Sequence, residues 1–422
     1  MPRENHKWVP GEEPPKIRPH SLAKHRVIDA YLRRYVDVLT QNRRIPEFRL
    51  TLVDGFSGGG VYRDWKTGER QPGSPMIMLE AMRDAAIAAQ EKRSKEFNLD
   101  VEYFFIEKKP TFFSYLESTL RESEFQTFLG QQVHLLRGNF VEQLPAILQQ
   151  IRQRGRGERA IFLLDQFGYK DVPMPEIRRI FSELKNAEVI LTFATDAMIN
   201  YLSESEVTQK ILGRIGLELT ADQITIRKQM REWRQAIQLL LHGEIQQKSG
   251  AKFYTPFFIR SPDEHRDFWL IHLSGQSKAR DVMVTQHWAE RTSFAHYGGS
   301  GLHMLGYDPE KDSNVTRQEM LPGFFFDDTA LASSQDCLLE QLPERLFQYK
   351  DGISFRNFFA GITNETPATS EIIKDVLEDL TLKGWIKVDS EKGVHRKKRI
   401  QHQSDIILPA KHRQLYLPGA DI

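Results

Sequence analysis

The chain has 422 residues, more than one hydrophobic core commonly organises, so we expect a large domain and a smaller one. Its 58 basic and 57 acidic residues nearly cancel, which excludes a global electrostatic attraction and leaves nucleic-acid contact to local patches. The single cysteine, Cys337, excludes a disulfide framework and a cysteine-rich metal site, and the histidines show no metal-ligand spacing.

An N-terminal arm, residues 1–20, is rich in proline and charge. It lacks the pattern of a signal peptide, and no run in the chain approaches the length of a membrane span, so we expect a cytoplasmic protein without membrane contact. Ser21 then begins a helix that reaches about Asn42, with one apolar face for packing on the first strand. That face contains Val27, Ile28, Tyr31, Leu32, Tyr35, Val38 and Leu39.

Residues 49–62 combine an apolar run, Asp54 and a glycine turn at positions 58–60. Glycine tolerates positive φ and lets a ligand approach the main chain, so a buried strand that ends here predicts a small-molecule site; a tight turn before a helix is the alternative. Arg63 stands where a dinucleotide fingerprint needs its third glycine, and no P-loop lysine follows. S-adenosylmethionine, a nucleoside ligand without phosphates, fits this spacing better.

A loop of about eighteen residues leads to Ser74, which we expect to cap a helix that ends near Lys95. Loops of that length inside a compact domain are often functional. Short apolar runs then alternate with helical patterns, which predicts a mostly parallel sheet covered on both faces. The runs are Val101–Ile106, Val133–Leu136, Ala160–Leu164 and Val189–Ala194.

A helical insertion from about Glu204 to Ser249 is followed by two further runs, Phe253–Arg260 and Asp267–Ser274. The turn residues between these runs indicate an antiparallel hairpin at the end of the sheet. Five parallel strands closed by a hairpin form the methyltransferase variant of the doubly wound α/β fold.

Polar residues at the strand ends are the candidate ligands of the cofactor. Glu107 can bind ribose hydroxyls or pair with a neighbouring lysine, and Asn139 can read the adenine edge or cap the next helix. Asp54 can meet the amino group of the ligand or fix the glycine turn. The predicted cofactor-binding residues are Asp54, Phe56, Ser57, Gly58, Gly60, Glu107 and Asn139.

The fourth strand ends in Asp165, Gln166 and Phe167. Methyltransferases that act on exocyclic amines place acceptor oxygens and an aromatic ring here, to bind the target amine and to stack on a flipped base. We interpret Asp165 as the residue that orients the acceptor and Phe167 as the stacking group; a helix cap and a core residue are the alternatives. Gln166 occupies a position where proline is expected.

From about Leu339 to the end, residues 339–422, the order of elements is that of a winged helix-turn-helix. Helices are expected at Leu346–Tyr349, Phe355–Ile362 and Ser370–Lys383, and strands at Trp385–Val388 and Arg399–Ile407. A basic wing can meet phosphates or form a solvated turn, and it consists of Lys392, Arg396, Lys397, Lys398 and Arg399. Acidic residues on the third helix would be repelled by DNA, so either only its first turn reaches a duplex or the module binds protein.

The chain resembles the three-Cys-motif partner proteins (TcmP) over most of its length. The resemblance lies in the first helix, the segment 53–60, the turn at 73–75, Phe105-Ile106-Glu107, the strand end at 164–168 and the C-terminal unit. It implies a class I S-adenosylmethionine-dependent methyltransferase domain over residues 21–320. It also implies a separate partner protein that is radical-S-adenosylmethionine-like and carries three cysteines. Where the family tends to have Asp-Pro-Phe-Gly, this chain has Asp165-Gln166-Phe167-Gly168.

We therefore predict an S-adenosylmethionine-dependent methyltransferase that acts on DNA or RNA together with the three-cysteine partner and uses no metal. The alternative is a non-catalytic adaptor that recruits this partner to nucleic acid. A nucleotide-binding dehydrogenase is disfavoured by the glycine spacing.

Overall fold

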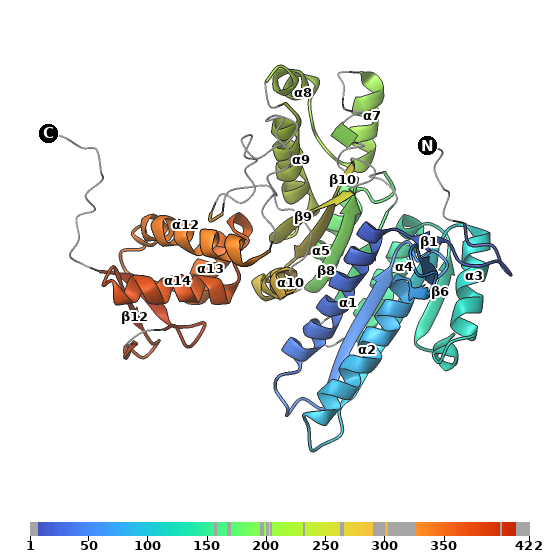
Figure 1. The fold of residues 1–422 in the computed structure, drawn as a ribbon, viewed down its shortest axis with the longest axis horizontal. Coiled ribbons are helices and arrows are strands. Elements are labelled where there is room, and N and C mark those ends of the chain that lie inside the picture. Colours follow the sequence, from blue (N-terminus) through green and yellow to red (C-terminus); the bar gives the residue numbers. More distant parts are fainter. Residues whose placement is uncertain are drawn as a thin grey trace. The chain divides into compact units, whose positions relative to one another are not determined.

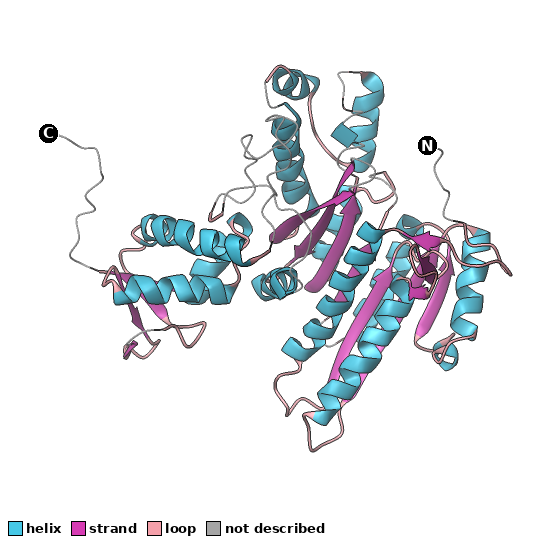
Figure 2. Cartoon of the chain, in the orientation of Figure 1, coloured by secondary structure: helices cyan, strands magenta, loops and turns pink. Residues whose placement is uncertain are grey.

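A computed structural model describes residues 7–155, 158–166, 170–194, 198–199, 202, 205–230, 233–261, 266–289, 300–302, 326–396 and 399–410. The chain forms two compact units, Met1–Ala295 and His296–Ile422. Figures 1 and 2 show their helices and strands.

A seven-stranded sheet forms the centre of the first unit, with strand order β6-β5-β2-β7-β8-β10-β9 (Figure 1). Neighbours from β6 to β8 pair in parallel, whereas β10 is antiparallel to both β8 and β9. The strands are β2 (Glu47–Asp54), β5 (Asn98–Glu107), β6 (Val133–Arg137), β7 (Arg159–Leu164), β8 (Asn186–Phe193), β9 (Phe253–Ser261) and β10 (Arg266–Ser274). The predicted parallel sheet with a closing hairpin is confirmed, and each strand lies within a few residues of its predicted position.

Helices cover the sheet because each has one apolar face. Helix α1 (Pro19–Leu39) packs against α2 (Ser74–Glu91) and α10 (Ser277–Ala289), and α5 (Met174–Glu183) packs against α4 (Phe140–Arg154) and α9 (Trp233–Ser249). Helix α3 (Pro110–Arg121) contacts β5 and β6. Ser74 is the first residue of α2 and not its cap, because Gly73 holds the N-cap position.

The segment that the sequence analysis treats as a long loop contains a hairpin, β3 (Val61–Asp64) and β4 (Arg70–Pro72). The N-terminal arm adds β1 (Lys16–Ile17) in parallel to β3 and completes a three-stranded sheet. Arg63 fastens the arm further, because its Nε donates to the carbonyl of Pro14. The arm is therefore an integral part of the first unit.

The helical insertion is divided into α7 (Glu206–Ile215), α8 (Ala221–Lys228) and the longer α9. Ile224 and Ile237 are fully buried, as a core stripe requires, but Ile226 and Met230 are among the exposed hydrophobic residues. The sequence predicts one core stripe that includes Ile224, Ile226 and Met230, and this is wrong at the last two positions. Ile226 lies two residues after Ile224 in the same helix and therefore on its opposite side, and Met230 follows the end of α8.

The second unit contains α12 (Asp328–Leu346), α13 (Phe355–Ile362) and α14 (Ser370–Leu382), together with a four-stranded sheet of order β11-β14-β12-β13. Its strands are β11 (Ile353–Ser354), β12 (Ile386–Asp389), β13 (His395–Arg396) and β14 (Ile406–Pro409). This is a winged helix-turn-helix, as predicted, with two corrections. The first helix ends at Leu346, the residue at which the sequence analysis begins it. The last strand begins at Ile406 and not at Arg399, because the buried Asp405 accepts from the main-chain N–H groups of Gln401 and His402 and holds this segment in a turn.

Candidate functional site

Asp54, Glu107 and Asp165 lie at the carboxyl ends of β2, β5 and β7, and we refer to these three residues as the carboxylate edge. The three strands are direct neighbours, with β2 in the middle, and Asp54 is in register with Phe105 on one side and Leu163 on the other. In parallel sheets of this kind, ligands bind in the crevice outside the carboxyl ends of the strands. The structure thus brings together the three acids that the sequence analysis selects.

The glycine turn follows Asp54 directly. Gly58 and Gly60 have φ values of +58° and +78°, which a residue with a side chain adopts only with strain. Gly59 is needed for another reason: a Cβ atom there would lie 2.1 Å from Cδ1 of Trp8. The side chain that approaches this part of the turn closely is the indole of the arm, so ligand contact at Gly58 and Gly60 stays a prediction for their main-chain groups.

Trp8 is only 4% exposed and its Nε1 donates to the carbonyl of Val61 at 2.7 Å. Its ring makes edge contacts with Tyr62 and Phe112, at centroid distances of 5.0 and 4.8 Å. The arm is therefore locked onto the segment that leads out of the glycine turn.

Glu107 holds the glycine turn from the neighbouring strand. Its Oε2 accepts from the N–H of Gly58 at 3.0 Å, and its Oε1 accepts from the N–H of Lys109 at 2.8 Å. The alternative role of Glu107, pairing with a neighbouring lysine, is thus present as a contact with the main-chain N–H of Lys109. A carboxylate offers about four acceptor positions, so Glu107 retains capacity for hydroxyl groups of a ligand.

Asp54 is fully buried, and its Oδ1 accepts from the N–H of Phe56 at 3.0 Å. Ser57 is also buried, and its hydroxyl donates to the carbonyl of Asp54. Burial raises the pKa of Asp54 to about 7, and the nearby carboxylates of Asp165 and Glu107 act in the same direction. Asp54 fixes the start of the turn, which is one of its two expected roles.

Asp165 forms an ion pair with Lys24 of α1. The side chain of Lys24 is 8% exposed and that of Asp165 is 28% exposed, so the pair is largely shielded from water. Although burial opposes ionisation, Lys24 holds the pKa of Asp165 below its usual range. Burial and the charge of Lys24 lower the pKa of the adjacent His25 to about 4, so this imidazole is neutral near pH 7.

Lys24, His25, Tyr62 and Trp8 belong to this site, and the sequence analysis does not select them. Burial, with the carboxylates of Asp165, Asp54 and Glu107, raises the pKa of Tyr62 far above its usual range, and the centroid of its ring lies 5.9 Å from that of His25. One of these residues has a readable signal. Lys24 lies four positions before Ile28 and seven before Tyr31, and therefore on the apolar face of the helix.

The remaining predicted site residues have mixed outcomes. Asn139 is the N-cap of α4 in a capping box with Glu142, whose Oε2 accepts from the N–H of Asn139 at 3.5 Å, so its cap role is present and adenine contact stays a prediction. Gln166 is buried, and its Oε1 accepts from the N–H groups of Asp171 and Val172 at 3.0 and 3.2 Å. This side chain holds the segment after β7 in place of the expected proline. Phe167 lies outside the described residues.

The basic wing is only partly described, because Lys397 and Lys398 lie outside the described residues. Arg396 Nη2 pairs with the buried Asp405 at 3.0 Å. Arg399 lies 2.8 Å from Glu371 and 2.9 Å from Asp375, both on α14. The acidic face of the third helix thus neutralises part of the wing.

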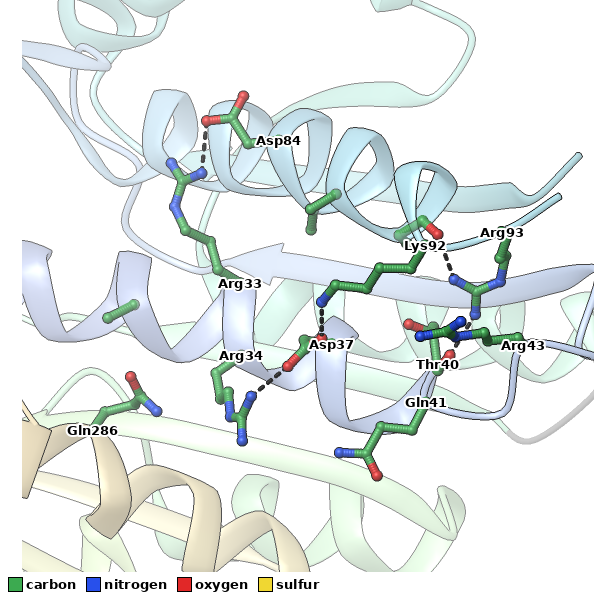
Figure 3. Close-up of a pocket in the computed structure, with 14 residues that line it drawn as sticks. Arg33, Arg34, Asp37, Thr40, Gln41, Arg43, Asp84, Lys92, Arg93 and Gln286 are labelled. Atoms are coloured by element: carbon green, nitrogen blue, oxygen red, sulfur yellow. Dashed lines mark hydrogen bonds and ion pairs between the residues drawn. The ribbon is translucent and has the colours of Figure 1, made fainter.

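A hollow, the helix groove, lies between α1 and α2 (Figure 3). Alanines form part of its wall, and ion pairs cross it: Arg33 Nη1 lies 2.6 Å from Asp84 Oδ2, and Lys92 Nζ lies 2.7 Å from Asp37 Oδ1. Five basic and two acidic residues line it, which leaves an excess of three positive charges (5 − 2). The full lining is Ala30, Arg33, Arg34, Asp37, Thr40, Gln41, Arg43, Asp84, Ala85, Ala88, Ala89, Lys92, Arg93 and Gln286.

Within the described part of the chain, no group of three or more His, Cys, Asp or Glu side chains is arranged to hold a metal ion. None of the helices in that part is long and apolar enough to cross a bilayer.

Comparison with known proteins gives one family match and several distant structural likenesses. Residues 306–393 match the family model of the GMT-like wHTH domain, and no curated protein matches the chain. Similar solved structures include protein LPL1258 from Legionella pneumophila, at 13% identity and a TM-score of 0.34 over 61% of this chain and 89% of that one. A putative O-methyltransferase from Klebsiella pneumoniae has 11% identity and a TM-score of 0.26, with coverage of 60% and 87%.

A putative caffeoyl-CoA O-methyltransferase from Staphylococcus aureus has 14% identity and a TM-score of 0.26, with coverage of 61% of this chain and 93% of that one. The fold assignment follows from the strand order and directions of the sheet itself.

Proposed function

We propose that the chain is an S-adenosylmethionine-dependent methyltransferase. The observation that carries this proposal is the carboxylate edge: three acids on adjacent strands at the crevice of a doubly wound sheet, beside a glycine turn. The spare acceptor positions of Glu107 suit ribose hydroxyls, and the buried Asp54 lies beside the turn. Phe56, Ser57 and Asn139 complete the proposed cofactor-binding set.

The cofactor supplies a methyl group on an electrophilic sulfonium. The protein must hold the acceptor in line with that group at near-attack distance, about 3 Å. Asp165 suits this task because its lowered pKa keeps the carboxylate ionised and able to accept a hydrogen bond from an acceptor N–H. A carboxylate with a lowered pKa is a weak base, so Asp165 orients the acceptor, and the proton that the acceptor loses after methylation passes to water.

Calorimetric titration with S-adenosylhomocysteine and transfer of labelled methyl groups test this proposal. We expect micromolar binding, and we expect Asp165→Ala to abolish transfer while binding persists. Absence of binding to the full-length wild-type chain would remove the proposal.

Nucleic acid is the proposed acceptor class, and the helix groove supports it by its excess of positive charge. Arg43 is exposed and, within the described residues, makes no ion pair, so it is available to a phosphate. Charge reversal by Arg43→Glu should weaken binding to single-stranded DNA or RNA and reduce the salt dependence by about one unit of slope. Lys210→Glu on α7 is the control, because Lys210 is 80% exposed and does not line the groove.

A second candidate function is a non-catalytic adaptor that recruits the three-cysteine partner. Two observations favour it: Trp8 packs against the glycine turn, and Lys24 already neutralises Asp165. Methyl transfer to DNA and RNA should be measured with and without this partner. Cofactor binding without turnover in either condition would favour the adaptor, and turnover that needs the partner would make the two proteins one enzyme system.

A further inference from the structure

Acidic groups outnumber basic groups at the carboxylate edge. Asp54, Glu107 and Asp165 place three acidic groups there, and Lys24 is a buried cation beside them. Within the described residues, the other buried Lys or Arg side chain is Arg280 of α10, which interacts with Asp281. His25 cannot serve as a second cation near pH 7, because its pKa is lowered to about 4. Lys24 is therefore the buried positive group available to a ligand at this edge.

The proposed cofactor needs such a group. Its amino-acid end carries an ammonium and a carboxylate, and a site of acids alone would attract the first and repel the second. A carboxylate that leaves water requires a paired cation, because an unpaired buried charge is costly. Within the described residues, the Lys24 ammonium donates to Asp165 and has two further N–H donors.

Building on the proposed function, we propose that Lys24 binds the carboxylate at the amino-acid end of S-adenosylmethionine and thereby releases Asp165 to receive the acceptor. Two carboxylates, one from the protein and one from the cofactor, then compete for a single ammonium. The cofactor carboxylate takes the two further N–H donors and shares the charge of Lys24, so the pairing with Asp165 weakens. The acceptor oxygens of Asp165, whose side chain is 28% exposed, then become open to the acceptor N–H. Cofactor binding consequently precedes productive acceptor binding.

The test compares two ligands on the full-length chain by calorimetric titration: S-adenosylhomocysteine, and methylthioadenosine, which lacks the amino-acid end. Lys24→Met should weaken S-adenosylhomocysteine by about 30-fold or more, the loss typical of a truncated buried charge pair, and leave methylthioadenosine within about twofold. Lys16→Met, which changes an exposed lysine of β1, should change neither affinity.

Asp165→Asn removes the competing carboxylate and should strengthen S-adenosylhomocysteine by about threefold or more, with methylthioadenosine unchanged. The double variant Lys24→Met/Asp165→Asn has no unpaired charge, so it keeps the fold when the single variant does not, and it should show the same loss of discrimination as Lys24→Met.

These measurements test the role of Lys24, the release of Asp165 and the proposed function separately. Equal weakening of both ligands by Lys24→Met, or no change in either, would overturn the assignment of Lys24 while the methyltransferase proposal stands. An unchanged affinity in Asp165→Asn would overturn the release of Asp165. A wild-type chain that binds neither ligand would overturn the proposed function and this inference together.

Discussion

At the scale of single residues, burial and pairing act against each other on the carboxylate edge. Asp165 stays ionised because Lys24 compensates for lost hydration, whereas Asp54 pairs with no cation among the described residues and burial raises its pKa. Neighbouring acids in one crevice thus differ in charge near pH 7. Substitution of each residue should therefore have a different effect on the free energy of unfolding.

Removing the cation alone should be costly. Lys24→Met leaves Asp165 with an unpaired and largely buried charge, and we expect a loss of about 3 kcal/mol in the free energy of unfolding. Denaturant titration at pH 7 measures this loss. Lys24→Met/Asp165→Asn should recover much of it, and an equally unstable double variant would show that the pair contributes through packing.

Asp54 should make stability fall as the pH rises. Its pKa is about 7 in the folded chain, against an ordinary aspartate value of 3.8, so between these values the native state binds more protons than the unfolded state. The unfolding free energy should therefore decrease by up to about 4 kcal/mol between pH 4 and pH 7 relative to Asp54→Asn. Parallel stability curves for the two proteins would refute this pKa assignment.

The sequence predicts the positions of the acids but not their partners. Strand ends can be located from apolar runs, which is why Asp54, Glu107 and Asp165 were selected together. Lys24 is 141 positions from Asp165, and no local pattern reports such a pairing. A lysine on an apolar helix face is nevertheless a warning that a buried anion exists elsewhere.

At the scale of elements, the arm and the glycine turn form one packing unit. A methyl group at Gly59 would collide with the Trp8 ring, so Gly59→Ala should destabilise the wild type and cost little in a Trp8→Ala background. We expect a coupling energy of roughly 2 kcal/mol in this double-mutant cycle. Trp65→Ala is the control, because Trp65 is 46% exposed, and it should show no coupling to Gly59→Ala.

The basic wing and α14 also interact closely, because Arg399 of the wing forms ion pairs with acidic residues of α14. Glu371→Gln/Asp375→Asn removes the two acids nearest to Arg399. If the wing contacts nucleic acid, this double change should strengthen binding several-fold at low salt, and filter binding or fluorescence anisotropy measures it. Unchanged affinity would indicate that the module binds protein instead.

Elements with a buried apolar face were predictable, and those defined by polar tertiary contacts were not. The seven strands of the central sheet have apolar runs, whereas the hairpin β3–β4 is polar and owes its order to the arm. Pro19 also extends α1 into residues assigned to the arm, because proline is favoured in the first turn of a helix. Sequence periodicity does not show which elements pair with one another, as the arm and the hairpin do here.

At the scale of the whole molecule, a ligand of the first unit should stabilise that unit alone. At a concentration 100 times its Kd, S-adenosylhomocysteine should add about 2.7 kcal/mol to the first unit. Trp385 is the one tryptophan in the sequence of the second unit, so in Trp385→Phe the tryptophan fluorescence follows the first unit only. The unfolding transition of the first unit should move to higher temperature with S-adenosylhomocysteine, while methylthioadenosine at the same concentration gives a smaller shift.

The position of β10 has a consequence for synthesis on the ribosome. This strand separates β8 from β9, although it follows both in the chain. Until residue 274 has left the exit tunnel, β8 has an open edge on that side and β9 has no neighbouring strand. We therefore expect the open edges of β8 and β9 to need protection from pairing with other strands during this interval. Chaperone contacts with the nascent chain should be sought before β10 pairs with β8 and β9.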